Sequence, residues 1–244
     1  LFRSIGMRRA RRKLIKICGL TTEQDVRYAS TFLPDLAGFV LFFPKSKRNL
    51  EIARAIKLKE SLDKKVKSVA VVVSPSVEQV EIIQTAGFDY IQIHGSLAEE
   101  VYDAVHIPIL RAFNVSDMNE FTQMQKLDKI EGYIFDSNDP GSGSPFDWSL
   151  LEQIQRDDRL LFLAGGIHEG NAQEAMIRVN PDGIDVSSAV EYTKPDSGGI
   201  NGGQDRYPNE GGRCAGEEKK IIKTRGKDPE KMKRIIRMVH SYEQ

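Results

Sequence analysis

Apolar and polar positions alternate along the chain in blocks of two kinds. Eight short apolar runs have the length of buried strands, and longer amphipathic segments follow each of them. The strands are expected at residues 14–18, 36–42, 67–73, 90–93, 109–113, 132–135, 160–164 and 183–186. The helices are expected at residues 22–32, 49–63, 76–86, 97–105, 116–127, 147–155, 169–179 and 228–241. Strands that alternate with helices in this way predict βα units and a parallel sheet.

Two helix starts carry capping signals of their own. Thr21 offers a hydroxyl cap with Gln24 three residues later, and Ser76 precedes Gln79 at the same spacing. Eight βα units in about 250 residues predict an α/β protein with the (β/α)8 TIM-barrel fold in a single domain. A doubly wound open sheet is the alternative, and it usually carries a glycine-rich phosphate loop after its first strand. Only one glycine, Gly19, follows the first run, which favours the barrel.

The ends of the pattern define the domain organisation. Residues 1–13 form a basic N-terminal extension, and residues 14–244 form the barrel. Residues 194–226 are polar and rich in glycine, and we expect a long loop inserted between the last strand and the last helix.

Composition narrows the classes of partner. Lys and Arg number 35, as do Asp and Glu, so the chain has no net charge that would favour a nucleic acid or a membrane. The longest apolar stretch, residues 36–43, is far shorter than a membrane span. With 2 cysteines there is no disulfide framework, which suits a cytoplasmic protein.

In such barrels the active site lies at the carboxyl ends of the strands. Two turns of small residues follow the last two strands there, Gly165-Gly166 and Ser187-Ser188. Small residues leave backbone N–H groups accessible, and these two loops commonly bind phosphate in barrels. A third turn, residues 141–144, is also rich in glycine and serine. The sequence therefore predicts a phosphorylated small molecule as substrate.

Acid–base chemistry has two candidates at the same strand ends. Cys18 closes the first strand and Asp136 closes the sixth. An acid at neutral pH needs a raised pKa, and a thiolate base needs nearby positive charge to lower its pKa. The sequence alone does not name the group that supplies that charge. The histidines have no metal-ligand spacing and no dinucleotide or Walker motif occurs, so neither a metal nor a cofactor is expected.

Several motifs together resemble one enzyme family. They are KICGLT (16–21), PKSKR (44–48), IQIHG (91–95), GSGSPFDW (141–148), LAGGI (163–167), DVSSAVE (185–191) and GKDPEKMKRII (226–236). In this order they resemble phosphoribosylanthranilate isomerase of tryptophan biosynthesis, a (β/α)8 barrel. The resemblance implies an Amadori rearrangement of N-(5-phosphoribosyl)anthranilate to 1-(2-carboxyphenylamino)-1-deoxyribulose 5-phosphate, a reaction without a cofactor.

The resemblance also implies a role for each matching residue. Cys18 matches the family's general base and Asp136 its general acid. Arg48 matches the arginine that binds the anthranilate carboxylate, and Asp185 an aspartate near the ribose and amine. His94 stands where the family keeps a histidine. The phosphate loops correspond to Gly165, Gly166, Ser187 and Ser188.

Two alternatives stay open at this point. One is another phosphosugar barrel, such as an isomerase of histidine biosynthesis that acts on a related aminoaldose; such barrels usually pair two aspartates, and Cys18 stands at one of those positions. The other is a barrel that binds phosphate without catalysis, against which the intact Cys18 and Asp136 argue. The sequence leaves both a monomer and a homodimer possible.

Overall fold

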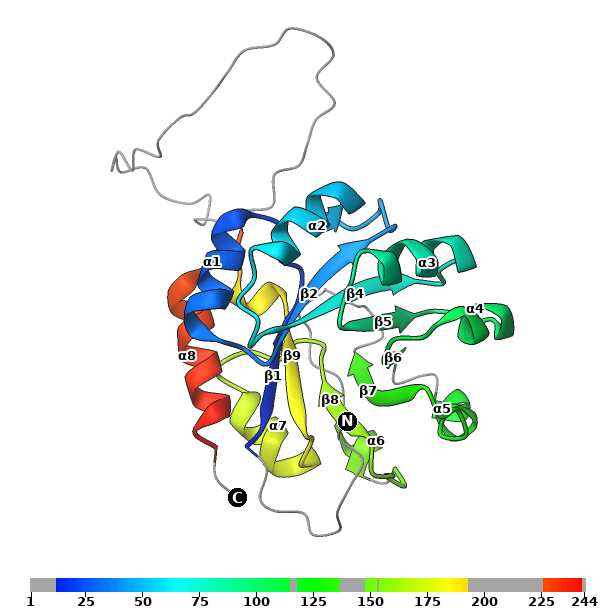
Figure 1. Cartoon of the computed structure of the whole chain (residues 1–244). Coiled ribbons are helices and arrows are strands. Elements are labelled where there is room, and N and C mark those ends of the chain that lie inside the picture. The colour runs from blue at the N-terminus through cyan, green and yellow to red at the C-terminus, as the bar shows by residue number, and fades with distance from the viewer. Residues whose placement is uncertain (1–11, 115–117, 137–147, 153, 193–225, 243–244) are drawn as a thin grey trace, which may run out of the picture.

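The computed structural model describes residues 12–114, 118–136, 148–152, 154–192 and 226–242. The strands are β1 (Leu14–Ile17), β2 (Leu36–Leu41), β3 (Asn49–Leu50), β4 (Lys67–Val73), β5 (Tyr90–His94), β6 (Ile109–Asn114), β7 (Ile130–Asp136), β8 (Leu160–Leu163) and β9 (Gly183–Val186). The helices are α1 (Glu23–Phe32), α2 (Ile52–Glu60), α3 (Val77–Thr85), α4 (Glu99–Ala104), α5 (Met118–Met124), α6 (Ser149–Glu152), α7 (Ala172–Val179), the short 3-10 helix η2 (Ser188–Val190) and α8 (Pro229–His240). Helices ring the strands, and α8 lies beside α1 on the outside of β1 (Figure 1).

The strands close into a parallel barrel. Their order is β1-β9-β8-β7-β6-β5-β4-β2, and β1 also pairs with β2, which completes the ring. The two-residue strand β3 pairs only with β2, where its residues extend that side of the sheet. All ladder pairings are parallel, so every carboxyl end points to the same mouth. The predicted (β/α)8 barrel is confirmed, with every expected strand in place.

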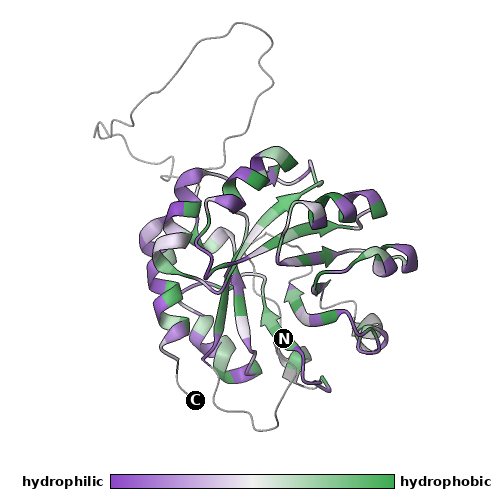
Figure 2. Cartoon of the chain, viewed as in Figure 1, coloured by the Kyte–Doolittle hydropathy of each residue, from purple (hydrophilic) through white to green (hydrophobic). Residues whose placement is uncertain are grey.

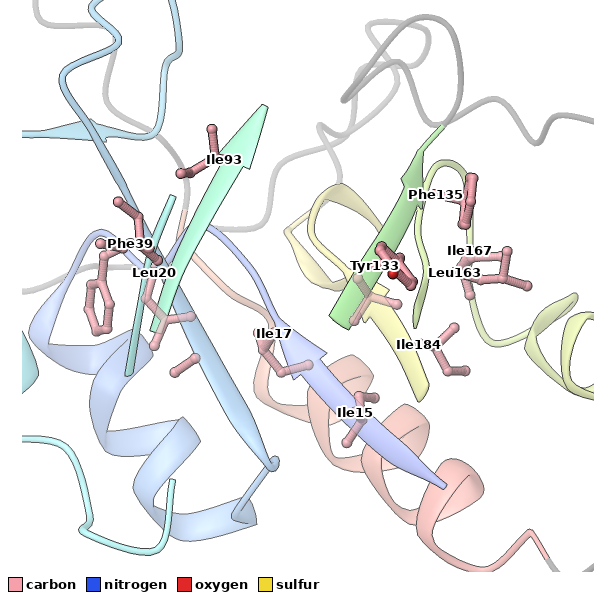
Figure 3. Packing of buried hydrophobic residues seen from close by; sticks show 14 of the residues in the cluster. Ile15, Ile17, Leu20, Phe39, Ile93, Tyr133, Phe135, Leu163, Ile167 and Ile184 are labelled. Carbon is pink, nitrogen blue, oxygen red and sulfur yellow. The ribbon is translucent and has the colours of Figure 1, made fainter. Parts of the chain in front are cut away.

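Successive residues of each strand face opposite sides, as the period of two requires. Ile15 and Ile17 point from β1 toward α8 and belong to the large apolar layer between strands and helices (Figure 3). Cys18 belongs instead to the smaller cluster inside the barrel, with Leu36, Val69, Val71, Leu110, Ala112, Ile134, Phe162 and Ala164. Figure 2 shows apolar strands inside a ring of helices that carry hydrophilic residues. The barrel thus buries both faces of its strands, and polar residues on the inner face need a specific reason.

Every expected helix is present, but most are shorter than expected: α6 covers Ser149–Glu152 rather than 147–155, and α7 begins at Ala172 rather than at 169. Two other helix starts differ for a local reason. The cap of α1 is Thr22 rather than Thr21, because the Thr22 hydroxyl accepts from the Asp25 amide and the Asp25 carboxylate accepts from the Thr22 amide. The box at Ser76 and Gln79 forms as expected. The helix expected from residue 49 begins at Ile52, because residues 49–50 pair with β2 instead.

The last residues of the basic extension are held by the barrel. Arg12 pairs with Asp35, and the buried Lys13 ammonium donates to Asn180 Oδ1 at 2.6 Å and to the Pro181 carbonyl at 2.7 Å. Residues 1–11, the turn at 141–144 and the expected insertion at 194–226, apart from Gly226, lie outside the described residues. Within the described ranges, no helix is both long and apolar enough to cross a membrane.

Candidate active site

A small hollow with about 50 Å³ of space for water, open to solvent, lies at the carboxyl ends of three neighbouring strands. Its lining combines two carboxylates with the two small-residue turns: Asp136, Ala164, Gly165, Gly166, Ile167, Asp185, Ser187 and Ser188. Asp136 ends β7, the glycine pair follows β8, and Asp185 lies in β9. Six of the nine residues predicted from the sequence therefore line one hollow.

The glycine pair has a backbone conformation that other residues rarely adopt. Gly165 and Gly166 have φ values of 70° and 69°, in the left-handed region. Their backbone therefore reaches the rim of the hollow with no Cβ in the way. Across the hollow, η2 begins at Ser188 directly after β9. Ala189, which stands where the resembling family usually has glycine, does not have a positive φ, so this position needs no glycine here.

Cys18 lies beside the hollow rather than in its lining. Its amide donates to the Val186 carbonyl at 2.8 Å, and the Ser187 hydroxyl donates to its carbonyl at 3.1 Å. These two bonds fix the end of β1 against the start of the loop after β9. Part of the cysteine stays accessible to solvent. The structure thus places the candidate base next to the wall that carries Asp185 and the serine pair.

Lys16 is the main functional candidate that sequence reasoning missed. It precedes Cys18 by two positions and shares its inward face, and its ammonium lies 2.7 Å from Asp185 Oδ2. The Lys16 side chain has no exposed surface. The signal in the sequence was the lysine that interrupts the apolar run LIKIC, since an inward lysine in a barrel strand needs a buried partner. The long-range pairing of β1 with β9 supplies that partner, with Lys16 in register with Asp185.

The charges around Cys18 oppose one another. Burial raises the pKa of the Cys18 thiol, Lys16 and Lys227 act to lower it, and Asp185 adds to the rise. The outcome is a raised pKa, so the thiol dominates at neutral pH. We expected nearby cations to lower this pKa; the cations are present, but desolvation outweighs them. Burial also raises the pKa of Asp185, against the attraction of Lys16 and Lys227.

Arg48 reaches the site from the loop between β2 and β3. Its stem crosses Gly19, where a Cβ would lie 2.3 Å from Arg48 Cδ and 3.3 Å from Ser187 Oγ. The guanidinium donates from Nε to Glu191 Oε1 at 2.6 Å. Its buried Nη2 has no hydrogen-bond partner among the described residues. The arginine is therefore held on one side and retains donor capacity on the other.

Lys227 was also missed, because it follows the long glycine-rich segment and lies far from the other motifs in sequence. It is buried, and its ammonium donates to the Ser187 carbonyl at 3.0 Å and lies 3.5 Å from Glu191. Its amide donates to Asp25 Oδ1 at 2.7 Å, which ties it to the start of α1. Burial lowers the pKa of Lys227, while Glu191 opposes the change.

His94 ends β5 on the inner face. Its Nε2 lies 2.7 Å from Gln92 Nε2, so the neutral ring accepts from the Gln92 amide. Burial lowers the pKa of His94 to about 4, and the charges of Lys16 and Arg111 act in the same direction. The ring is therefore uncharged at neutral pH, and the strand order places it on the wall of the barrel opposite β9.

Arg111 faces the other way. Its neighbours Ile109 and Phe113 belong to the layer between strands and helices, and its guanidinium donates to carbonyls at the end of β5, including that of Ile93 at 2.8 Å. It supports the strand that carries His94 and does not line the hollow. Among the described residues, no group of three or more His, Cys, Asp or Glu side chains could hold a metal ion.

Comparison with known proteins gives one consistent family. The family model for N-(5'-phosphoribosyl)anthranilate (PRA) isomerase matches residues 15–196. The N-(5'-phosphoribosyl)anthranilate isomerase of Thermoanaerobacter sp. (strain X514) is 36% identical over 183 residues, which cover 72% of this chain and 88% of that protein. The protein of the same name from Streptococcus mutans is 37% identical over 180 residues, covering 72% of this chain and 89% of that protein. The solved structure of phosphoribosyl anthranilate isomerase from Thermotoga maritima matches with a TM-score of 0.72 and 25% identity, over 94% of this chain and 100% of that chain.

Proposed function

The chain belongs to the N-(5'-phosphoribosyl)anthranilate isomerase family of tryptophan biosynthesis, and we propose that Cys18 and Asp136 are the base and the acid of the isomerase reaction. The observation that carries this assignment is the shared mouth of the barrel. Asp136 lines the hollow with both small-residue turns, and Cys18 is bonded to the wall of that hollow through Ser187. A carboxyl group and a thiol are thus brought to the same mouth of the barrel, beside the turns that we assign to the phosphate.

The reaction opens a sugar ring and then moves a proton. Asp136 gives its proton to the furanose ring oxygen as the bond between that oxygen and C1′ breaks, which leaves a protonated Schiff base between C1′ and the amine. The Cys18 thiolate removes the proton from C2′, and the electron pair of that bond forms the C1′–C2′ double bond of an enolamine. A proton added at C1′ and one lost from the C2′ hydroxyl give the ketone. Substrate and product are isomers, so no oxidant or reductant enters.

Substrate binding is assigned to residues around the same mouth. We assign the phosphate to Gly165, Gly166, Ser187 and Ser188, which line the hollow and whose small or absent side chains suit binding through backbone N–H groups. The anthranilate carboxylate is placed against Arg48, whose buried Nη2 retains donor capacity beyond its bond to Glu191. Binding at both ends of the substrate holds the sugar while its ring opens.

Asp185 and His94 stay candidates for the ribose and the amine. Asp185 lines the hollow, but one of its oxygens is held by Lys16. With Nε2 accepting from Gln92, the uncharged His94 ring keeps its Nδ1–H as a donor and adds no charge next to a protonated Schiff base. Lys16 and Lys227 add buried positive charge near a substrate that carries a phosphate and a carboxylate.

The test is turnover of phosphoribosylanthranilate, followed by the loss of its fluorescence with purified protein. Cys18→Ala and Asp136→Asn should each lower kcat by about 100-fold to 10,000-fold while the thermal melt stays cooperative. Cys214→Ala, at the other cysteine of the chain, is the matched control and should keep full activity. Near-normal turnover in both site variants would refute the assignment. Turnover of the histidine-pathway aminoaldose at a comparable rate would favour an isomerase of histidine biosynthesis. No turnover of either substrate would favour a barrel that binds phosphate without catalysis.

Two further expectations belong to this proposal. We place the enzyme in the cytoplasm, supported by its family and by its 2 cysteines. We expect a monomer or a homodimer; the Thermotoga maritima enzyme is described as dimeric. Light scattering of the purified protein separates these two states, and a larger assembly would contradict both.

A further inference from the structure

A buried ion pair lies directly below Cys18 on the inner face of the barrel. The Lys16 ammonium and the Asp185 carboxylate are 2.7 Å apart, and their side chains are 0% and 5% exposed. Ile15 and Ile17 point outward to α8, which leaves Lys16 and Cys18 adjacent on the inward face of β1 (Figure 3). The reaction outlined above requires only that Cys18 ionise, and it gives Lys16 no task of its own.

Stability does not account for this pair. Burying two charges costs several kcal/mol in desolvation, and apolar residues of similar volume often serve a protein equally well at such positions. The pair is also incompletely satisfied, because Asp185 Oδ1 is buried without a hydrogen-bond partner among the described residues. Because this ion pair is incompletely satisfied and Lys16 lies two positions from Cys18, we look for its role in the chemistry of the thiol.

The neighbouring strand places no side chain between the ammonium and the thiol. Gly38 of β2 faces both, since a Cβ at Gly38 would lie 3.0 Å from Cys18 Sγ and 3.2 Å from Lys16 Nζ. The missing side chain leaves nothing between the two groups on that side. Gly38 and Lys16 are buried, so the charge of Lys16 acts on the thiol from a side that is shielded from water.

Electrostatics agree with this arrangement. Burial alone would lower the pKa of Lys16, but the charges of Asp185 and Cys18 outweigh it and raise that pKa. Lys16 therefore stays protonated throughout the neutral range. One ammonium is thus bonded to the carboxylate and also attracts the sulfur. Lys227 also lowers the pKa of Cys18 but is engaged with Ser187 and Glu191.

We propose that Lys16 is a positioning residue that stabilises the Cys18 thiolate, and that Asp185 limits this stabilisation by sharing the same ammonium. The proposal deepens the assigned role of Cys18 and rests on it. The thiol proton leaves to solvent, and Lys16 keeps its own proton. Removing Lys16 and removing Asp185 must therefore change the ionisation of Cys18 in opposite directions, a pattern that a purely structural ion pair does not produce.

The test measures Cys18 itself. In a Cys214→Ser background the chain has a single thiol, and its rate of alkylation by iodoacetamide as a function of pH gives its pKa without any substrate. Lys16→Met should slow alkylation at pH 8 by about tenfold or more, since an opposite charge at this range shifts a pKa by about one to three units. Asp185→Asn should speed it. Lys16→Arg, which keeps the charge, should restore most of the rate.

Two further variants keep the test decisive. Lys13→Met removes another buried lysine next to β1 that bonds Asn180 and Pro181 at the far end of the strand, and it should leave the alkylation profile unchanged. If Lys16→Met does not fold, Lys16→Met/Asp185→Asn replaces it and is compared with Asp185→Asn alone. The double variant should then react more slowly than the single one.

The outcomes separate this inference from the function. The inference is overturned if Lys16→Met leaves the alkylation rate of Cys18 unchanged, or if Lys16→Met and Asp185→Asn shift it in the same direction. This holds even where turnover falls. The expected opposite shifts support it, and the pH profile of kcat/KM should then move with the alkylation pKa. A third outcome is possible: the two variants shift the alkylation pKa in opposite directions, but the pH profile of kcat/KM does not change. That outcome would refute Cys18 as the base and would still support its electrostatic coupling to Lys16.

Discussion

The substitution Gly38→Ala adds a single methyl group on β2 and tests the geometry around Cys18. The Cβ of Gly38→Ala would lie 3.0 Å from Cys18 Sγ, 3.2 Å from Cys18 Cα and 3.2 Å from Lys16 Nζ. Ordinary contacts begin near 3.4 Å, so the sulfur or its backbone must move by at least several tenths of an ångström. A misplacement of 1 Å can cost about 100-fold in rate, so a shift of half that size should lower kcat by about tenfold.

The assay is steady-state turnover of phosphoribosylanthranilate beside urea unfolding. Gly132→Ala on β7 is the matched control, because its Cβ would meet Leu110 Cδ2 at 3.0 Å and Leu160 at 3.1 Å, away from the site. Both variants should lose about 1–3 kcal/mol of stability through overpacking. Only Gly38→Ala should lose kcat, with KM little changed. Equal kcat in the two folded variants would refute the close approach of Gly38 to Cys18 that this prediction rests on.

Three further predictions follow from charged groups. Because burial raises the pKa of Cys18 above its usual value and the base is the deprotonated form, kcat/KM should keep rising from pH 7 to above pH 9, and a plateau from pH 7 would contradict this. Glu191→Gln removes the partner of Arg48 and should raise KM for the substrate by about tenfold with a smaller change in kcat, measured by steady-state kinetics. Burial opposes ionisation of Asp35, but His240, the Ile15 amide and Arg12 outweigh it and lower the pKa of Asp35. Its stabilising effect is therefore present above the unfolded pKa of about 3.9 and lost as pH falls through the folded value, so Asp35→Asn should lower the free energy of unfolding at pH 7 and the difference should vanish in acid urea titrations.

The sequence determined the parts of the structure that depend on local order. The period of the apolar runs located every strand of the barrel, and the period of two within LIKIC already separates inward Lys16 and Cys18 from outward Ile15 and Ile17. The small-residue turns and Asp136 followed from one rule, that parallel strands end at the same mouth. The resemblance to a family rested on the same motifs, and the comparisons confirm the family.

Only the tertiary structure decided which groups meet across the barrel. The partners of Lys16 and Ser187 are Asp185 and Lys227, which lie 169 and 40 residues away in the chain. Strand register brings Lys16 and Asp185 together, the segment before α8 brings Lys227 to Ser187, and no local pattern specifies either. In the sequence Gly38 is one residue of an apolar strand. In the closed barrel the same residue faces both the Cys18 thiol and the Lys16 ammonium.

The ionisation of Cys18 is the clearest case of this division. The sequence predicts a thiol that needs positive charge, and the inward lysine two positions before it is visible in the same short run. The direction of the pKa shift depends on a balance of desolvation against Lys16, Asp185 and Lys227. Desolvation is set by everything that surrounds an atom, so the sequence fixes which charges the chain carries, whereas packing decides how strongly each of them acts on the sulfur.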